Sequence, residues 1–254
     1  MLVVERQQLI LEQLRRKGTV SVRELARTIG SPDVTVRRDL TTLARGGLVR
    51  RTRGGATVSM WPGTIEADQS PATPPSREEL AIAYAASELI RTGDTIVIAG
   101  GPTTLALALQ LVNSVRLTIV TNSLVIAGVF RNAHEIEVHV AGGLLCRPSM
   151  ELIGLDSSQA LRGLRATSAF ISADGITARH GLSSRSFAAA GSVRVLASAA
   201  NRVVGLVDHT KVGTEASFQV VPCSIINDLI TGSGADAVAL EQIQEAGVSV
   251  RIGE

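Results

Sequence analysis

Residues 21–56, SVRELARTIGSPDVTVRRDLTTLARGGLVRRTRGGA, decide the fold of the amino-terminal part of the chain. Ser21 and Glu24 match a capping box, in which each side chain satisfies a free amide at a helix start. Gly30 can take the backbone angles that end this helix, after which Ser31 can cap a second helix with Pro32 in its first turn. A turn this short makes the two helices cross steeply.

The second helix has one apolar and one polar side at 100° per residue. Its expected anchors are Val36, Leu40, Leu43 and Ala44. The opposite side carries Val34, Thr35, Arg38, Thr41 and Thr42, with Arg37 on one flank. Arginine can make two hydrogen bonds to a guanine edge, and threonine offers a hydroxyl and a methyl to other bases. This side therefore has the chemistry that reads a DNA groove. The alternative for Arg38 is that its side chain is only solvated.

A wing is expected after the second helix, because the run that follows Gly46 and Gly47 is strand-like and turns at Gly54 and Gly55. Its arginines, Arg50, Arg51 and Arg53, would lie along the DNA backbone or enter the minor groove. A first helix over residues 4–17 completes the head, with Leu9, Ile10 and Leu14 expected inward. Asp39 would be repelled by phosphate, so we expect it to be the structural partner of an arginine such as Arg23 or Arg27.

Charge is divided unevenly along the chain. Residues 1–60 hold twelve Lys or Arg against five Asp or Glu, a net charge of +7, whereas the remainder holds thirteen against eighteen, or −5. No aromatic residue precedes Trp61, which argues against single-stranded nucleic acid, because that mode stacks bases on rings. Double-stranded DNA is therefore the predicted partner.

Composition limits the class of protein. The chain is 45% hydrophobic but only 2% aromatic, so its core must consist of Ala, Val, Leu and Ile. No apolar run approaches the roughly 20 residues that span a bilayer, and the amino terminus lacks a signal-peptide core, so we expect no membrane association and a cytoplasmic location. Cys146 and Cys223 lack metal or disulfide spacing and are expected to be buried small hydrophobes. No metal or cofactor is predicted.

The predicted domains are a winged helix-turn-helix over residues 1–57, a Pro-rich linker over 58–75, and an α/β domain over 76–254. A second capping box, Ser76 with Glu79, opens a helix that Gly93 stops. Its expected inward residues are Leu80, Ala83, Ala86 and Ile90.

The larger domain is predicted to be α/β with a mostly parallel sheet covered on both faces, because short apolar runs alternate with helical ones. The runs are 95–98, 117–120, 135–140, 169–172, 203–207, 224–226 and 249–252, and two helical stretches are 103–111 and 235–246. Such sheets bind ligands at the carboxyl ends of strands. That rule indicates the loops 99–104, 121–123, 172–176 and 208–213.

Residues 35–40 with Leu43, followed by 51–56, closely resemble the DNA-binding head of the DeoR family of bacterial transcription regulators. Further matches at 120–123, 141–143, Gly154, 173–176, 181–182 and 208–213 extend the resemblance along nearly the whole chain. It implies a repressor of carbohydrate genes, usually oligomeric, whose second domain looks like a sugar-phosphate isomerase turned into a sensor. A phosphorylated sugar would release it from its operator.

The candidate DNA-binding residues are thus Ser31, Val34, Thr35, Arg37, Arg38, Thr41, Thr42, Arg50, Arg51 and Arg53. The candidate effector-binding residues, from the loops and the resemblance together, are Gly100, Gly101, Thr103, Thr104, Asn122, Asp174, Arg194 and Lys211.

Three hypotheses follow for the larger domain. It senses a sugar phosphate and homo-oligomerises, which we favour. Alternatively its pocket binds a different ligand or none, because Ala99, Pro102, Ala189 and Val193 stand where the family usually has an aspartate, a hydroxyl residue, a glutamate and a lysine. The third hypothesis, an enzyme, needs an acid and base pair, for which Asp174, Asp208, His209 and Lys211 are the only plausible candidates. We expect no catalytic residue.

Overall fold

The computed structural model describes residues 3–45, 49–52, 54–58, 75–112, 116–147, 149–154, 161 and 163–254. Contacts divide the chain into two compact units, Met1–Thr73 and Pro74–Glu254, and each is described by itself. Residues 59–74, most of the predicted linker, lie outside the described part of the chain. Within the described residues, no helix is long and apolar enough to cross a membrane.

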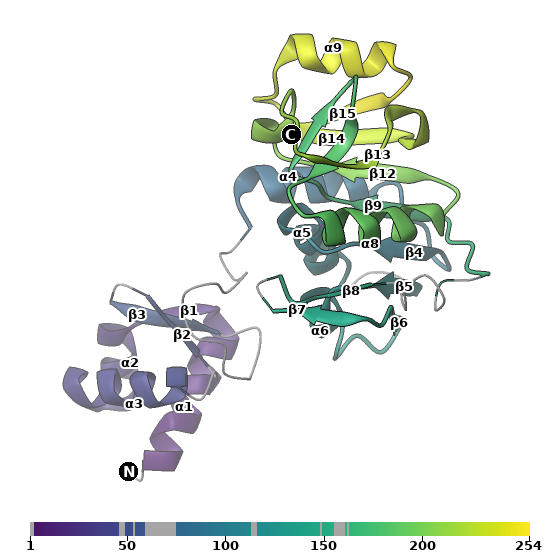
Figure 1. Cartoon of the computed structure of the whole chain (residues 1–254). Coiled ribbons are helices and arrows are strands. Elements are labelled where there is room, and N and C mark those ends of the chain that lie inside the picture. The colour runs from purple at the N-terminus through teal and green to yellow at the C-terminus, as the bar shows by residue number, and fades with distance from the viewer. Residues whose placement is uncertain are drawn as a thin grey trace. The chain divides into compact units, whose positions relative to one another are not determined.

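The amino-terminal unit is a winged helix-turn-helix (Figure 1). Its elements are α1 (Val3–Lys17), β1 (Thr19–Ser21), α2 (Val22–Ile29), α3 (Asp33–Arg45), β2 (Val49–Thr52) and β3 (Gly55–Val58). The predicted wing is confirmed, since β2 and β3 pair antiparallel. β1 adds to the far side of β3 and was not predicted. Gly55 permits this pairing, because a Cβ there would lie only 2.3 Å from the Val20 carbonyl oxygen.

The core of this unit contains the predicted anchors of α3. Val36 and Leu40 have no exposed surface, Leu43 is 3% exposed, and Ala44 packs against them half-buried. From α1, Ile10 and Leu14 are buried as expected, but Leu9 is 39% exposed, so its inward assignment was wrong. Ile10 and Leu14 are four residues apart and therefore face the core together, whereas Leu9, one residue before Ile10, is turned away by 100°.

The turn between α2 and α3 begins as predicted and continues differently. Gly30 ends α2 in the left-handed region at φ 68°. Pro32, rather than Ser31, then stands immediately before α3, and its carbonyl accepts the amides of Thr35 and Val36. Ser31 instead donates its amide to the Ala26 carbonyl at 3.0 Å, which closes the end of α2.

Only half of the first capping box forms. The Ser21 hydroxyl accepts the Glu24 amide at 3.2 Å. The Glu24 carboxylate pairs with the Lys17 ammonium. An ion pair across the α1–α2 corner thus replaces the reciprocal hydrogen bond that was expected.

The larger unit has a seven-stranded parallel sheet at its centre. Its strands are β4 (Thr95–Ile98), β5 (Leu117–Thr121), β6 (Ile136–Val140), β9 (Ser168–Ile171), β12 (Val203–Leu206), β14 (Asp228–Gly232) and β15 (Ser249–Gly253), in the spatial order β15-β14-β12-β9-β4-β5-β6. Six of the seven predicted strands are confirmed. The strand predicted at 224–226 was wrong: Cys223–Ile225 is a turn of 3-10 helix, and the strand begins at Asp228.

Two helical layers cover the sheet (Figure 1). Its helices are α4 (Arg77–Ser87), α5 (Pro102–Leu111), α6 (Leu124–Val129), α8 (Phe187–Ser198) and α9 (Ala237–Glu245). α4, α5 and α6 pack with Ile96 and Ile98 on one face, whereas α8 and α9 pack in the cluster of Val97 and Ala99 on the other. This alternation along β4 is expected of a strand buried on both faces.

The second capping box, at α4, is complete. The Ser76 hydroxyl accepts the Glu79 amide, and the Glu79 carboxylate accepts the Ser76 amide. The buried side of α4 consists of Ile82, Ala83 and Ala86. The expectation was wrong for Leu80, which is 47% exposed. Ile90 packs against the core as expected, but it lies beyond the helix, which ends at Ser87 rather than continuing to Gly93.

Two small antiparallel sheets complete the larger unit, and neither was predicted. One is the hairpin of β7 (Leu144–Cys146) and β8 (Glu151–Ile153). The other contains β10 (Gly175–Thr177), β11 (Gly181–Ser184) and β13 (Phe218–Val221) in the order β10-β11-β13. Their strands have three or four residues, too few for an alternating pattern to stand out.

Candidate nucleic-acid interface and ligand pocket

The polar side of α3 is open within the amino-terminal unit. Val34 is 77% exposed, Arg37, Arg38 and Thr42 are exposed, and Ser31, Thr35 and Thr41 are half-buried. The opposite side is closed by the core. The structure therefore gathers the predicted groove-reading residues of α3 on one accessible side of a rigid helix.

The threonine hydroxyls of this surface are already engaged as donors. Thr41 Oγ1 donates to the Arg37 carbonyl at 2.8 Å, and Thr42 Oγ1 donates to the Arg38 carbonyl at 3.2 Å. Toward a ligand, these residues present methyl groups and oxygen lone pairs. Arg37 and Arg38 are the cationic side chains on this face of α3 that can donate to base edges or phosphates.

Arg51 connects the wing to α3. Its Nη1 donates to Thr41 Oγ1 at 3.0 Å, and the side chain is otherwise exposed. Arg50 lies in the same strand, β2, and Arg53 falls outside the described residues. The contact between Arg51 and Thr41 joins the wing to α3.

Asp39 braces α3 against α1. Its carboxylate accepts two hydrogen bonds from the Arg6 guanidinium, at 2.5 and 3.3 Å, and one from the Gln7 amide at 3.4 Å. The expected structural pairing of Asp39 with an arginine is confirmed, but the partner is Arg6 rather than Arg23 or Arg27. Arg6 lies 33 residues away in the sequence, and nothing in the local pattern of α3 points to it.

The four predicted loops lie together at one edge of the sheet. They follow β4, β5, β9 and β12, which are adjacent in the sheet and all parallel. The carboxyl ends of parallel neighbours meet at the same edge, where open α/β sheets bind ligands. The expectation that these loops form one cluster is confirmed.

The glycine loop after β4 is closely packed. Gly101 precedes α5 at φ 151°, and the helix start has no side-chain cap. A Cβ on Gly101 would lie 2.7 Å from Ser172 Cβ, and a Cβ on Gly100 would lie 1.9 Å from Glu151 Oε1. Gly101 is therefore needed for close approach, whereas the neighbour of Gly100 is the carboxylate end of a flexible side chain.

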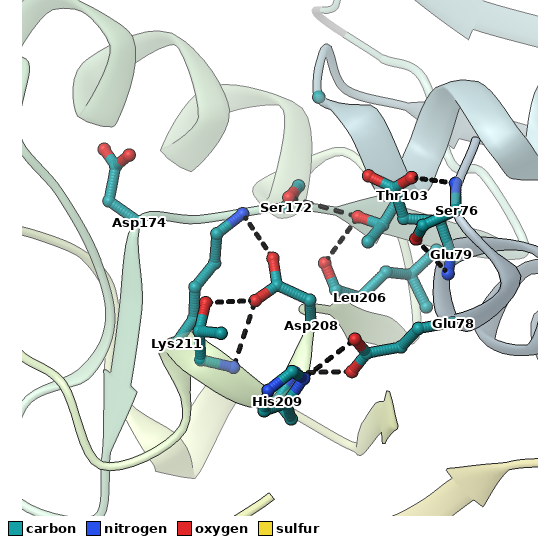
Figure 2. A network of polar contacts seen from close by, with 12 residues as sticks. Ser76, Glu78, Glu79, Thr103, Ser172, Asp174, Leu206, Asp208, His209 and Lys211 are labelled. Atoms are coloured by element: carbon teal, nitrogen blue, oxygen red, sulfur yellow. Dashed lines mark hydrogen bonds and ion pairs between the residues drawn. The ribbon is translucent and has the colours of Figure 1, made fainter. Parts of the chain in front are cut away.

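The hydroxyl groups of α5 hold the loops together. Thr103 Oγ1 is fully buried and donates to the Leu206 carbonyl at 2.7 Å, with Ser172 Oγ at 3.2 Å (Figure 2). Thr104 Oγ1 donates to the Gly101 carbonyl at 3.0 Å. Both were predicted to contact an effector. The structure gives each a structural role instead, because the donated hydrogen is used inside the protein.

The predicted cations of the pocket are engaged too. Lys211 Nζ lies 3.1 Å from Asp208 Oδ2, and Figure 2 shows the ammonium directed at that carboxylate. The Arg194 guanidinium donates to the carbonyls of Val220 and Gln219 in β13. Arg194 therefore ties α8 to the small sheet, which contradicts the free, ligand-facing role expected of it.

Asp174 is held by the residues that follow β11. Its carboxylate accepts hydrogen bonds from the Ser184 hydroxyl at 3.1 Å and from the Arg185 guanidinium at 2.9 Å. Burial alone would raise the pKa of Asp174, but the bonds from Arg185 and Ser184 outweigh it and bring the pKa below its ordinary value. Asp174 is therefore an ionised, positioned acceptor.

Sequence reasoning missed Glu151, which the β7–β8 hairpin brings to the glycine loop. Glu151 forms an isolated bridge with Ser123, and Asn122 Nδ2 donates to the Leu152 carbonyl at 3.2 Å. Asn122 Oδ1, in a side chain that is 1% exposed, has no hydrogen-bond partner among the described residues. Two three-residue strands gave no signal that could have placed Glu151 here.

The candidates for acid and base chemistry form a network with assigned partners. His209 Nδ1 lies 2.8 Å from Glu78 Oε2, and its amide donates to Glu78 Oε1 at 2.7 Å (Figure 2). Asp208 caps the short helix at 209–211 through the Thr210 amide and also pairs with Lys211. Each group therefore ties the loop after β12 together or joins it to α4.

Other described features add no competing site. No group of three or more His, Cys, Asp or Glu within the described ranges could hold a metal ion. Cys223 is buried as expected, whereas Cys146 is half-buried, and both thiols are free. A shallow cavity of about 390 Å³ lies beside α9 and shares only Val212 and Gly213 with the loop at 208–213. It does not reach the glycine loop.

These two units define a DNA-binding regulator with a sensor domain. A family model described as the DeoR-like helix-turn-helix domain matches residues 6–60, and the model of the DeoR C-terminal sensor domain matches residues 76–233. The chain belongs to the DeoR family of transcriptional regulators, and its relatives are DNA-binding regulators rather than enzymes.

Similar proteins cover the whole chain. It is 32% identical to the uncharacterized HTH-type transcriptional regulator YgbI of Escherichia coli K12, over 100% of this chain and 99% of that one. It is 27% identical to the putative aga operon transcriptional repressor of E. coli O157:H7, over 97% and 92%. A solved ribose 5-phosphate isomerase A from Methanocaldococcus jannaschii is 19% identical, covers 52% of each chain and has a TM-score of 0.40.

Proposed function

We propose that this chain represses carbohydrate genes by binding an operator in double-stranded DNA through α3 and the wing. The observation that carries this proposal is the open polar side of α3, with Arg37, Arg38 and Thr42 exposed opposite a closed core. We assign residues 1–57 to DNA binding, 58–75 to a linker and 76–254 to sensing. A cytoplasmic location follows from contact with DNA.

Roles can be assigned by chemistry. Arg38 lies in the middle of the exposed side and is proposed to make paired hydrogen bonds to a guanine edge. Arg37 and Arg51 are proposed to contact phosphates, and Arg50 and Arg53 to follow the backbone or the minor groove. Val34, Thr35 and Thr42 would supply methyl contacts, Thr42 also an acceptor, while Ser31 and Thr41 border the surface.

The sensor unit is proposed to bind a small carbohydrate-derived ligand at the ends of β4, β5, β9 and β12, and the protein to act as a homo-oligomer. The similarity to a repressor named for the aga operon supports a carbohydrate-related role. Binding at this site would favour one arrangement of the protein and so change its operator affinity.

Two ligand classes were considered, and the contacts favour the second. A phosphorylated sugar needs free donors or cations, but Arg194 and the hydroxyl of Thr103 donate to main-chain carbonyls, and the charge of Lys211 is balanced by Asp208. A pocket altered for a different ligand agrees with these contacts and with Ala99, which replaces the carboxylate usual in the family. We therefore favour the altered pocket.

The first experiment measures binding of the full chain to DNA from upstream of its own gene, with a random duplex of equal length as control. Both affinities are taken from fluorescence anisotropy at one fixed salt concentration, because phosphate contacts make affinity depend on salt. The proposal predicts tighter binding to the upstream DNA by about a thousandfold or more. Equal affinity for the two duplexes would contradict it.

A further inference from the structure

The β7–β8 hairpin places a carboxylate on the glycine loop. Leu152 donates its amide to the Asn122 carbonyl at 2.8 Å, and Leu124 donates its amide to the Met150 carbonyl at 3.0 Å. These bonds join the hairpin to the loop after β5 on both sides of Glu151. The Glu151 side chain therefore takes a defined position, with Oε1 where a Cβ of residue 100 would otherwise be.

The Glu151 carboxylate lies against the glycine loop that precedes α5. Gly101 begins the ten-residue helix α5, whose first turn has no side-chain cap. Unpaired amides and the helix dipole favour negative charge at such an end. A ligand's phosphate bound in this loop would therefore lie next to the like charge of Glu151.

Acceptor oxygens and like charge lie near the Glu151 carboxylate. Asn122 Oδ1 is buried without a partner, and the negative charge of Asp174 acts on Glu151. The nearby cations Arg185 and Lys211 are paired with Asp174 and Asp208. An anionic ligand group would therefore meet like charge, whereas a hydroxyl group could donate to these oxygens.

We propose that Glu151 determines the ligand class of this pocket: its carboxylate lies against the Gly100–Gly101 loop, disfavours a phosphate there, and favours a ligand that presents hydroxyl donors to Glu151 and Asn122. This inference rests on the proposed ligand-binding function of the sensor unit. It makes Glu151 a specificity-determining residue and gives a physical reason for the altered pocket.

The test uses inorganic phosphate as the probe and the full chain as the receptor, with affinity measured by isothermal titration calorimetry at constant ionic strength. Glu151→Gln removes the charge and keeps the size, whereas Glu151→Ala removes both. Glu135→Gln, at an exposed position before β6, is the matched control for loss of one negative charge. We expect either or both Glu151 variants to bind phosphate about tenfold more tightly than the unaltered chain and the control.

Phosphate binding that is equally weak or equally tight in all four proteins would overturn the inference. Circular dichroism checks that each variant is folded, and Glu151→Gln carries the test if Glu151→Ala is not. Operator binding by the unaltered chain, measured without phosphate, tests the proposed function separately. Tight operator binding together with equal phosphate affinities would contradict only the assignment of Glu151.

Discussion

At the scale of single residues, the head depends on a contact between helices that are distant in sequence. Asp39 is 4% exposed, and Arg6 and Gln7 of α1 supply its hydrogen bonds. A buried carboxylate is tolerated because it is paired, and removing one partner leaves the other buried without compensation. This pairing lies behind α3 and holds its exposed side toward solvent.

We therefore predict that Asp39→Asn lowers the unfolding temperature of the smaller unit, followed by calorimetry of the full chain. Glu12→Gln, an exposed change of charge on α1, is the control and should have little effect. Combining Asp39→Asn with Arg6→Gln should recover part of the loss, because no unpaired charge remains. The single variant Arg6→Gln is measured as well. If the loss of stability in the double variant equals the sum of the losses in Asp39→Asn and Arg6→Gln, the pairing is contradicted.

Glu151 provides a prediction of pH dependence. Burial raises the pKa of this carboxyl above its ordinary value, and the charge of Asp174 adds to the effect, while a hydrogen bond from Ser149 opposes it. A raised pKa in the folded state gives stability that is present below about pH 4.3, the pKa in the unfolded chain, and is lost as pH rises through the folded pKa. Glu151→Gln has no carboxyl group at this position, so its stability does not decrease in this way as pH rises.

The stability of Glu151→Gln relative to the unaltered chain should therefore increase as pH rises through that window and then level off. Denaturant unfolding at a series of pH values measures the difference. Glu135→Gln, which is exposed, should show no such increase. A difference that is constant with pH, or that decreases as pH rises, would mean that the carboxylate is not buried on the glycine loop.

The pocket shows what sequence can predict about a site and what it cannot. The rule for parallel sheets located the four loops correctly, because it depends only on strand direction. Side-chain directions depend on packing, so Thr103 and Arg194, taken for ligand contacts, proved to be committed to main-chain carbonyls. Glu151 was missed because its position depends on a hairpin joined to a distant loop.

At the scale of secondary structure, capping residues determine where helices begin. The box at α4 is complete, with bonds of 3.1 Å from the Glu79 amide to Ser76 Oγ and 2.6 Å from the Ser76 amide to Glu79 Oε2. These bonds satisfy amides that the helix itself leaves free. They also place Glu78 where it meets His209.

Ser76→Ala should accordingly destabilise the larger unit by about 0.5–2 kcal/mol. Calorimetry of the full chain measures the change in the transition of that unit. Ser87→Ala, at the other end of α4, is the control, and it should not destabilise because alanine is the better helix former. Equal losses from both changes would show that the cap contributes nothing specific.

Prediction of strands succeeded for six of the seven strands of the parallel sheet, where apolar runs alternate with helical stretches, even though β4, β9 and β12 have only four residues. The short strands β1, β7, β8, β10, β11 and β13 lie outside this alternation and were not predicted. The apolar run at 224–226 forms a 3-10 turn before β14, since periodicity over three residues cannot distinguish a turn from a strand.

At the scale of the whole molecule, the chain combines a basic head with a slightly acidic remainder. The charge of the head predicts binding that weakens steeply as salt rises, because each phosphate contact releases counterions. Six contacts would give a slope of about −5 in a plot of log affinity against log salt concentration.

Arg51→Ala should reduce this slope by about one and weaken all duplexes alike. Anisotropy titrations over a range of salt concentrations measure both effects. A slope near zero for the unaltered chain would exclude binding through phosphates. An unchanged slope in Arg51→Ala would show that Arg51 does not contact a phosphate.

The central claim is that the exposed side of α3 reads the operator sequence. Its most direct test is the ratio of affinities for the upstream duplex and a random duplex, measured at one salt concentration for Arg38→Ala and for a control, Arg91→Ala, an exposed arginine of the larger unit. We predict that Arg38→Ala loses about 1–3 kcal/mol on the upstream duplex and little on the random one, while the control keeps the full ratio. An unchanged ratio in Arg38→Ala would contradict the account.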